Sequence, residues 1–103
     1  MDEGAAVRES VDRILKYVHA IIDELDDFSG KWNHLDEGER VSWSLDWDQA
    51  MGAHLRFLEQ QYGRQVMTEA QAGRYRDLLR RIKEHLPVIH GLGLYSPPLP
   101  LEV

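Results

Sequence analysis

The chain has 103 residues, of which 43% are hydrophobic and 29% charged, with a formal net charge of −6 and no cysteine. This composition is typical of a single globular domain, and it excludes disulfides, thiolate nucleophiles and zinc–thiolate sites. No run approaches the roughly 18 consecutive apolar residues of a membrane span, and the acidic start lacks the features of a secretory signal, so we expect a cytoplasmic protein.

The charge is unevenly distributed along the chain. Of the 18 acidic side chains, 13 lie within residues 1–48, whereas 7 of the 12 basic ones lie within residues 49–103. Overall acidity argues against nucleic-acid binding, which needs several basic side chains at phosphates. Two interpretations stay open: an acidic first helix beside a basic last helix, or an acidic half that binds a basic protein partner.

The first predicted helix spans about residues 5–28. Its apolar side chains from Val7 to Phe28 alternate in spacing between four and three residues, which is typical of a helix that packs along a seam. Leu15 and Ile22 widen this seam, so we expect two neighbouring elements. Gly30 then provides the glycine that commonly follows a last helical turn.

The second predicted helix spans about residues 37–62 and begins at a capping box formed by Asp36 and Glu39. At about 100° per residue, its apolar residues sweep roughly two-thirds of the circumference, more than a surface helix needs. A chain this short has few elements to cover them, so we expect a homodimer with this helix near the symmetry axis. The interface candidates are Trp43, Trp47, Met51, His54, Phe57 and Leu58.

Gly52 lies inside this second helix, where glycine costs about 1 kcal/mol relative to alanine. It marks either a close crossing of two helices or a break that divides the helix. We favour the crossing.

The third predicted helix begins at about residue 69, after a second capping box formed by Thr68 and Gln71. Pro87 disfavours helix at the preceding residues, so the helix ends near residue 86 or kinks and continues to about residue 90. The remaining residues, 91–103, form an extended tail. Its Pro97–Pro100 segment has the P-x-x-P spacing, and it either docks on the helices or binds another protein.

Together these elements predict one all-α domain, an antiparallel three-helix up-down-up bundle with an extended proline-rich C-terminal tail, dimerised through the second helix. No metal or cofactor is expected, because the five histidines do not supply three or four ligands at helical spacing. The acidic pairs that end the first helix resemble half of the magnesium site of MazG-type nucleotide pyrophosphatases. The second half of that pattern is missing, because acidic residues are isolated beyond Asp48.

One short motif indicates an enzyme. Arg80 and His85, five residues apart on the last helix, resemble the Arg-x4–6-His motif of the HEPN ribonuclease family. The resemblance covers six residues and implies that Arg80 contacts phosphate and that His85 acts as acid or base, commonly across a dimer interface. Arg81 departs from that family's pattern, in which a polar uncharged or acidic residue is usual.

The favoured hypothesis is therefore a non-enzymatic, self-associating helical module for protein–protein interaction. The alternatives are a HEPN-like ribonuclease or toxin-type enzyme that uses Arg80 and His85, and an acidic inhibitor or immunity protein that binds a basic partner.

Overall fold

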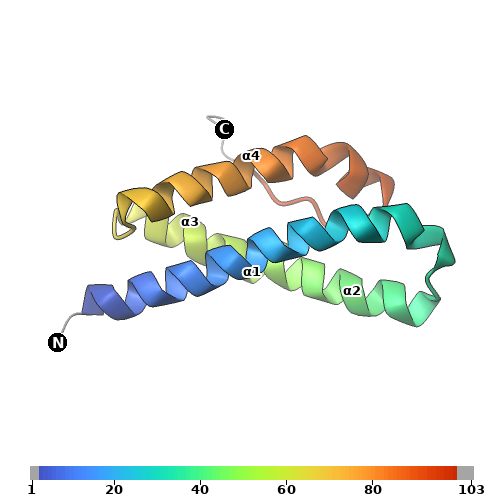
Figure 1. Cartoon of the computed structure of the whole chain (residues 1–103), viewed down its shortest axis with the longest axis horizontal. Coiled ribbons are helices and arrows are strands. Elements are labelled where there is room, and N and C mark those ends of the chain that lie inside the picture. The colour runs from blue at the N-terminus through green and yellow to red at the C-terminus, as the bar shows by residue number, and fades with distance from the viewer. Residues whose placement is uncertain (1–2, 100–103) are drawn as a thin grey trace.

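The structure is a computed structural model and describes residues 3–99. In this part of the chain every regular element is helical, which confirms the predicted all-α class. The elements are α1 (Glu3–Lys31), η1 (Trp32–His34), α2 (Glu37–Gln49), the π-helical turn η2 (Ala50–His54), α3 (Leu55–Gly63) and α4 (Glu69–Gly91). Because α2, η2 and α3 follow one another without a gap, they form one rod, and the fold has three helical segments (Figure 1).

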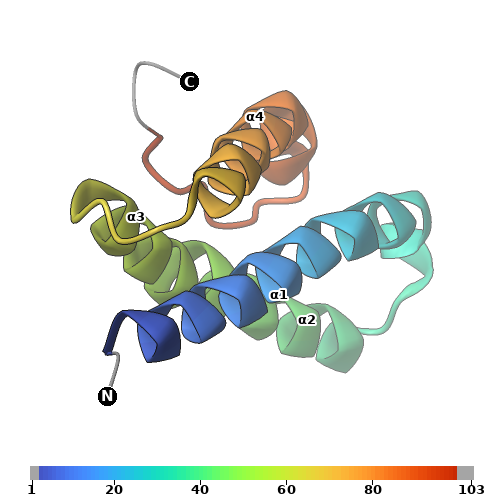
Figure 2. The ribbon, with the colours of Figure 1, turned by 60° about the vertical axis from the view of Figure 1, so that its left-hand side comes forward.

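The helix α1 contacts both other segments. Asp12 and Asp23 on one face contact α4, whereas Tyr17 and Glu24 on another face contact η2 and α2. Figure 2 shows that the rod and α1 are inclined to each other, with α4 packed above both. The seam predicted for α1 is buried, because Val11, Val18 and Leu25 are each 0% exposed.

The helix α1 extends one turn beyond its predicted end. Gly30 is helical, and the hydroxyl of Ser29 donates to the carbonyl oxygen of Asp26 at 3.0 Å. The chain reverses in η1 and residues 35–36 instead. Arg40 stabilises this reversal, because its Nε donates to the carbonyl oxygen of Trp32 at 2.9 Å.

Both predicted capping boxes are present. The backbone N–H of Glu39 donates to Oδ1 of Asp36 at 2.7 Å, which starts α2 at the predicted residue. The backbone N–H of Gln71 donates to Oγ1 of Thr68 at 3.1 Å, which starts α4. The sequence therefore located both helix starts correctly, since a cap is a local interaction between residues three apart.

The expected close crossing at Gly52 is wrong. A Cβ atom added there would meet no atom within 4 Å, so no helix approaches that position closely. The chain does not break there either, because Gly52 lies inside η2. A π turn forms i→i+5 hydrogen bonds and so has more residues per turn than an α-helix. Residues four apart, such as Trp47, Met51 and Leu55, therefore lie closer to one line along the rod.

The helix α4 continues through Pro87 to Gly91, the later of its two predicted ends. There Gly93 adopts a left-handed φ of 71°. The N–H of Gly93 donates to the carbonyl of His90, and the N–H of Leu94 donates to the carbonyl of Ile89 at 3.0 Å. This is a Schellman motif, and its characteristic apolar pair, Ile89 and Leu94, is buried.

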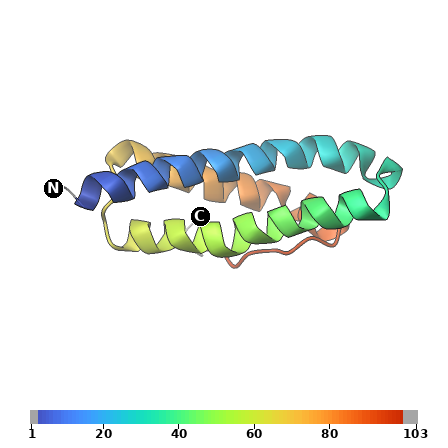
Figure 3. The same cartoon turned by 90° about the horizontal axis from the view of Figure 1, so that it is seen from below.

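Directed by this turn, residues 92–99 run back along α2 and η2 (Figure 3). Pro97 is buried, and the indole Nε1 of Trp47 donates to the carbonyl oxygen of Tyr95 at 2.8 Å. The segment 92–99, called the return segment below, thus covers part of the broad apolar face. Pro100 and the rest of the predicted tail lie outside the described residues.

The broad apolar face of the second predicted helix is largely covered within one chain. A single chain covers most of the candidate residues: Trp43 is 5% exposed, Met51 2%, and Trp47 and Leu58 0%. His54 and Phe57 are half-buried. Val41 and Leu45, which widened the apolar arc, are 52% and 63% exposed. The expected second copy is not needed to bury the tryptophans, because α1, α4 and the return segment do so.

Candidate functional site

The two enzyme candidates, Arg80 and His85, do not come together. Five residues on an α-helix are about 140° apart, so the two side chains leave α4 in different directions. Arg80 forms an ion pair with Asp77 on the same helix, and its side chain is 64% exposed. His85 lies against α1, where its Nε2 is 3.1 Å from Oδ1 of Asp26 and its Nδ1 is 2.6 Å from the carbonyl oxygen of Arg81.

A polar network joins α1 to α4, and Arg81 is at its centre. The guanidinium of Arg81 donates to Oδ1 of Asp23 at 2.6 Å and to Nδ1 of His19 at 3.1 Å. One end of the helix pair adds an ion pair between Arg74 and Asp12 at 3.4 Å. These contacts match the interpretation of an acidic first helix beside a basic last helix. The role of Arg81 was missed, although its four-residue spacing to His85 matches that of His19 to Asp23.

Buried polar groups in this network are well partnered. The side-chain amide of Gln71, a residue 3% exposed, donates to the carbonyl oxygen of Arg8 at 2.9 Å and to Oδ1 of Asp12 at 2.8 Å. Its Oε1 accepts from the N–H of Thr68. The residue therefore starts α4 and fastens that start to α1, which is a structural role.

Within residues 3–99, no group of three or more histidine and carboxylate side chains could hold a metal ion. None of the helices there is long and apolar enough to cross a membrane. Of the acidic residues at the end of α1, Asp23 contacts Arg81 and Asp26 contacts His85, both on α4, whereas Glu24 contacts Trp43 on α2.

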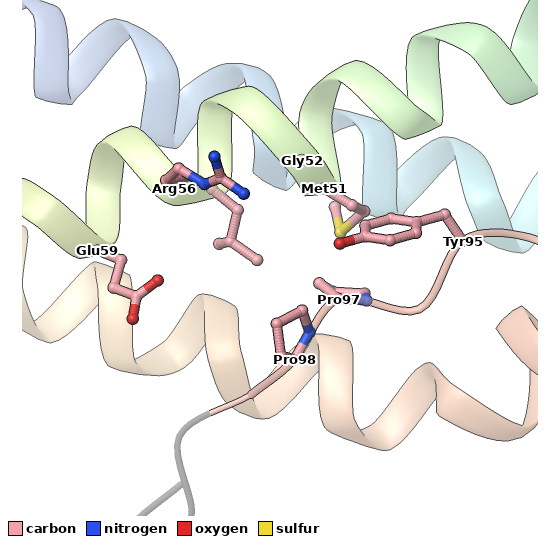
Figure 4. A pocket seen from close by; sticks show the side chains of 8 residues that line it. Met51, Gly52, Arg56, Glu59, Tyr95, Pro97 and Pro98 are labelled. Carbon is pink, nitrogen blue, oxygen red and sulfur yellow. The ribbon is translucent and has the colours of Figure 1, made fainter.

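Figure 4 shows a small pocket beneath the return segment. Tyr95, Pro97 and Pro98 lie on one side of it, and Met51, Gly52, Leu55, Arg56 and Glu59 lie on the other. Its volume is about 50 Å³, which accommodates only a few water molecules. We interpret this pocket as imperfect packing of the return segment against η2 and α3.

A larger, open hollow lies between the end of α1 and the start of α2, with a volume of about 490 Å³. We call it the acidic hollow. It is lined by Phe28, Asp36, Gly38, Glu39, Ser42, Trp43 and Asp46. Three of these seven residues are carboxylates and two are aromatic, so the hollow combines negative charge with an aromatic wall.

The aromatic wall is held rigidly. The rings of Phe28 and Trp43 stack at a centroid distance of 4.9 Å, and Trp43 stacks in turn on Trp47 at 5.6 Å. The indole Nε1 of Trp43 donates to Oε2 of Glu24 at 3.1 Å. Glu24 thus fixes the indole and adds a fourth carboxylate near the hollow.

The carboxylates of the hollow are held in their charged form or left exposed. The backbone N–H of Glu39 lowers the pKa of Asp36 below its usual value, with a further contribution from the Glu39 side chain. No ion pair within residues 3–99 joins Asp36, Glu39 or Asp46 to a basic side chain at 4.0 Å or less. The hollow therefore presents negative charge, which the nearby Arg40 offsets in part at Asp36.

The nearby basic side chains lie over aromatic rings. The Nζ of Lys31 is 5.1 Å from the centroid of the Phe28 ring, and the guanidinium of Arg40 is 5.9 Å from that of Trp32. Both distances fall within the range of cation–π interactions. The ring of Phe28, which lines the hollow, is thus paired with an ammonium group of the chain itself.

A third hollow, of about 420 Å³, lies between the end of α3 and α4. It is lined by Tyr62, Gly63, Gln65, Met67, Ala72 and Arg76. The guanidinium of Arg76 donates to the hydroxyl of Tyr62 at 3.3 Å, so the one charged group there is already engaged.

No protein-family model matches the sequence, and no curated protein or solved structure shows significant similarity to it.

Proposed function

We propose that this protein is a non-enzymatic helical module that binds a basic segment of another protein at the acidic hollow. In this proposal the three helical segments act as an antiparallel up-down-up bundle that holds the end of α1 against the start of α2. The observation that carries the proposal is the combination of Asp36, Glu39 and Asp46 with the rings of Phe28 and Trp43 in one hollow.

Charge supports a basic partner. Opposite charges steer association and disfavour partners of the same sign. A guanidinium can donate to a carboxylate in two parallel hydrogen bonds, so an arginine side chain suits the carboxylates of this hollow.

The enzyme alternative has less support. Arg80 and His85 diverge, and both ring nitrogens of His85 lie against acceptors within the fold. Replacing His85 with alanine tests this alternative in an RNA-cleavage assay. We expect no cleavage by either protein, and cleavage that the substitution abolishes in a folded protein would favour the enzyme.

The test of the proposed function is calorimetric titration with a synthetic amphipathic helical peptide that is rich in arginine. The hollow variant combines Asp36→Asn, Glu39→Gln and Asp46→Asn, which removes three charges while leaving residues that can still cap α2. The matched control combines Glu9→Gln, Asp48→Asn and Glu84→Gln, three exposed carboxylates outside the hollow.

We expect the hollow variant to lose affinity by about tenfold or more and the control by less than about twofold, where tenfold corresponds to about 1.4 kcal/mol. Equal losses would show that the peptide responds only to net charge. No measurable binding to the natural sequence would contradict the proposal.

A second candidate function is self-association through the outer face of α2. Val41 and Leu45 are one helical turn apart and are 52% and 63% exposed. Sedimentation at increasing concentration tests this candidate, with Leu45→Ser as the variant that should prevent dimerisation. Because the two copies would bring acidic helices together, salt should strengthen self-association, whereas it should weaken binding of a basic partner.

A further inference from the structure

The contact between His19 on α1 and Arg81 on α4 has a defined protonation state. An arginine guanidinium can only donate hydrogen bonds, so Nδ1 of His19, 3.1 Å from Nη1 of Arg81, must accept. The other ring nitrogen, Nε2, is 3.4 Å from the carbonyl oxygen of Arg74, which can only accept. The geometry therefore requires a neutral His19 ring that carries its hydrogen on Nε2.

The surroundings of His19 favour this neutral form. Partial burial is the main cause that lowers the pKa of His19 below its ordinary value of 6.5, and the positive charges of Arg81 and Arg74 lower it further. The Arg74 carbonyl and Asp23 act in the opposite direction. The helices α2 and α3 lie on the other side of α1, where His54 contacts the ring of Tyr17.

We propose that the contact between His19 and Arg81 is a pH-sensitive link between α1 and α4, which we call the clasp. When His19 is neutral, the guanidinium of Arg81 is held by both His19 and Asp23. When a proton binds Nδ1, two donors face each other and the imidazolium lies beside the charges of Arg81 and Arg74. Arg81 then keeps Asp23 and the backbone carbonyl oxygen of His19, which lies 3.5 Å from its Nη1, and the two helices lose one of the contacts between them.

The change caused by protonation of His19 is confined to the middle of the α1–α4 contact. His85 lies against the carbonyl of Arg81 and the carboxylate of Asp26, and both of these atoms accept hydrogen bonds. The change at His19 therefore loosens the middle of the α1–α4 contact while its flanks, at His85 and at the Arg74–Asp12 pair, remain.

The direction of the pH effect follows from the lowered pKa. Below pH 6.5 the unfolded chain binds a proton at His19 more readily than the folded protein does. The stabilisation by this contact is therefore complete above about pH 6.5 and is lost as the pH falls through the folded pKa. The clasp does not depend on the proposed binding of a basic partner.

The test is a histidine titration of the full chain by nuclear magnetic resonance, with the His19 signals assigned by His19→Gln. We expect the midpoint of His19 to lie below 6.5 and the ¹⁵N shifts of its neutral form to show hydrogen on Nε2. Arg81→Gln should move the midpoint upward. Arg80→Gln is the matched control, because it removes the same charge one residue away without a contact to His19, and it should leave the midpoint nearly unchanged.

A midpoint at or above 6.5 in the natural sequence would overturn the proposal, as would a neutral form with hydrogen on Nδ1. Equal shifts in the Arg81→Gln and Arg80→Gln variants would show that His19 responds only to overall charge, which also contradicts the clasp. If Arg81→Gln fails to fold, the midpoint and the ¹⁵N shifts of the natural sequence decide the question.

Discussion

The indole Nε1 of Trp47 donates to the carbonyl oxygen of Tyr95 at 2.8 Å, across 48 residues of sequence. This bond fastens the return segment to the centre of the long helical rod and covers a tryptophan that is 0% exposed. The acceptor is a backbone atom, so the contact depends on the path of the chain more than on the side chain of Tyr95. That path is set two residues earlier by the left-handed turn at Gly93.

Replacing Trp47 with phenylalanine tests the hydrogen bond. The substitution keeps an aromatic ring but removes the donor and some volume, and we expect a loss of about 1–3 kcal/mol in the free energy of unfolding. Urea denaturation measures this loss. The variant Tyr95→Phe is the control, since it changes only the side chain of the acceptor residue, and it should be close to neutral. A Trp47→Phe protein as stable as the parent would contradict the role of this bond.

Replacing Gly93 with alanine tests the turn that directs the return segment. An L-residue in the left-handed region costs about 1–2 kcal/mol, so the variant should be less stable, and its tryptophan fluorescence should be quenched more readily by acrylamide. Gly91→Ala is the matched control, because Gly91 ends α4 with a helical backbone and open space around it. It should be neutral or slightly stabilising, and equal destabilisation of both variants would argue against a special role for Gly93.

Replacing Gly52 with alanine should stabilise the protein by about 0.5–1 kcal/mol, because alanine reduces the freedom of the unfolded chain and no atom lies within 4 Å of the added methyl group. Gly73→Ala in α4, which also has open space, should give a gain of similar size. Thermal unfolding of both variants provides the comparison. Clear destabilisation by Gly52→Ala alone would restore the close crossing that the structure excludes.

The raised pKa of Tyr75 predicts that the protein loses stability at alkaline pH. Burial is the main cause that raises its pKa from 10.0 to about 12, with contributions from Glu59 and Tyr62. The unfolded chain loses this proton first, so the free energy of unfolding should fall by about 1.4 kcal/mol per pH unit in the window between the two values. Tyr75→Phe should lack this component when denaturation is followed from pH 9 to pH 12. If the free energy of unfolding has the same pH dependence in Tyr75→Phe as in the natural sequence, the pKa of Tyr75 is not raised in the folded protein.

The local features of this fold follow directly from the sequence. Both capping boxes act between residues three apart, so Asp36 and Thr68 mark their helices without reference to the rest of the chain. The buried seam of α1 follows from its spacing. The end of α1 did not follow, because Gly30 permits a helix end without enforcing one and the reversal depends on η1 and on Arg40.

The broad apolar face of the second helix could not be interpreted correctly from its own sequence. Part of this face is covered by the return segment, and the path of that segment is a long-range property that the second helix alone does not reveal. The wide arc also counted Val41 and Leu45 as buried, whereas both are exposed. A second copy and a returning tail solve the same problem, and only the three-dimensional path distinguishes them.

The candidate site was predictable only in parts. The sequence identified the acidic half and Trp43 separately, and it gave a basic partner as one interpretation. Their meeting with Phe28 in one hollow depends on the reversal between α1 and α2. The short motif of Arg80 and His85 matched a known spacing in the sequence. On the single helix α4, however, the two side chains point in different directions.

The most direct test of the proposed binding site compares two indole signals in the same molecule. The arginine-rich peptide is added to the ¹⁵N-labelled full chain, and the Nε1–H signals of Trp43 and Trp47 are followed by nuclear magnetic resonance. Trp43 lines the acidic hollow, whereas the N–H of Trp47 is held by Tyr95 on the side of the return segment. We predict saturable shifts of Trp43 and of residues 36–46 with little change at Trp47. Shifts spread evenly over all acidic surfaces, or none at Trp43, would contradict binding at the hollow.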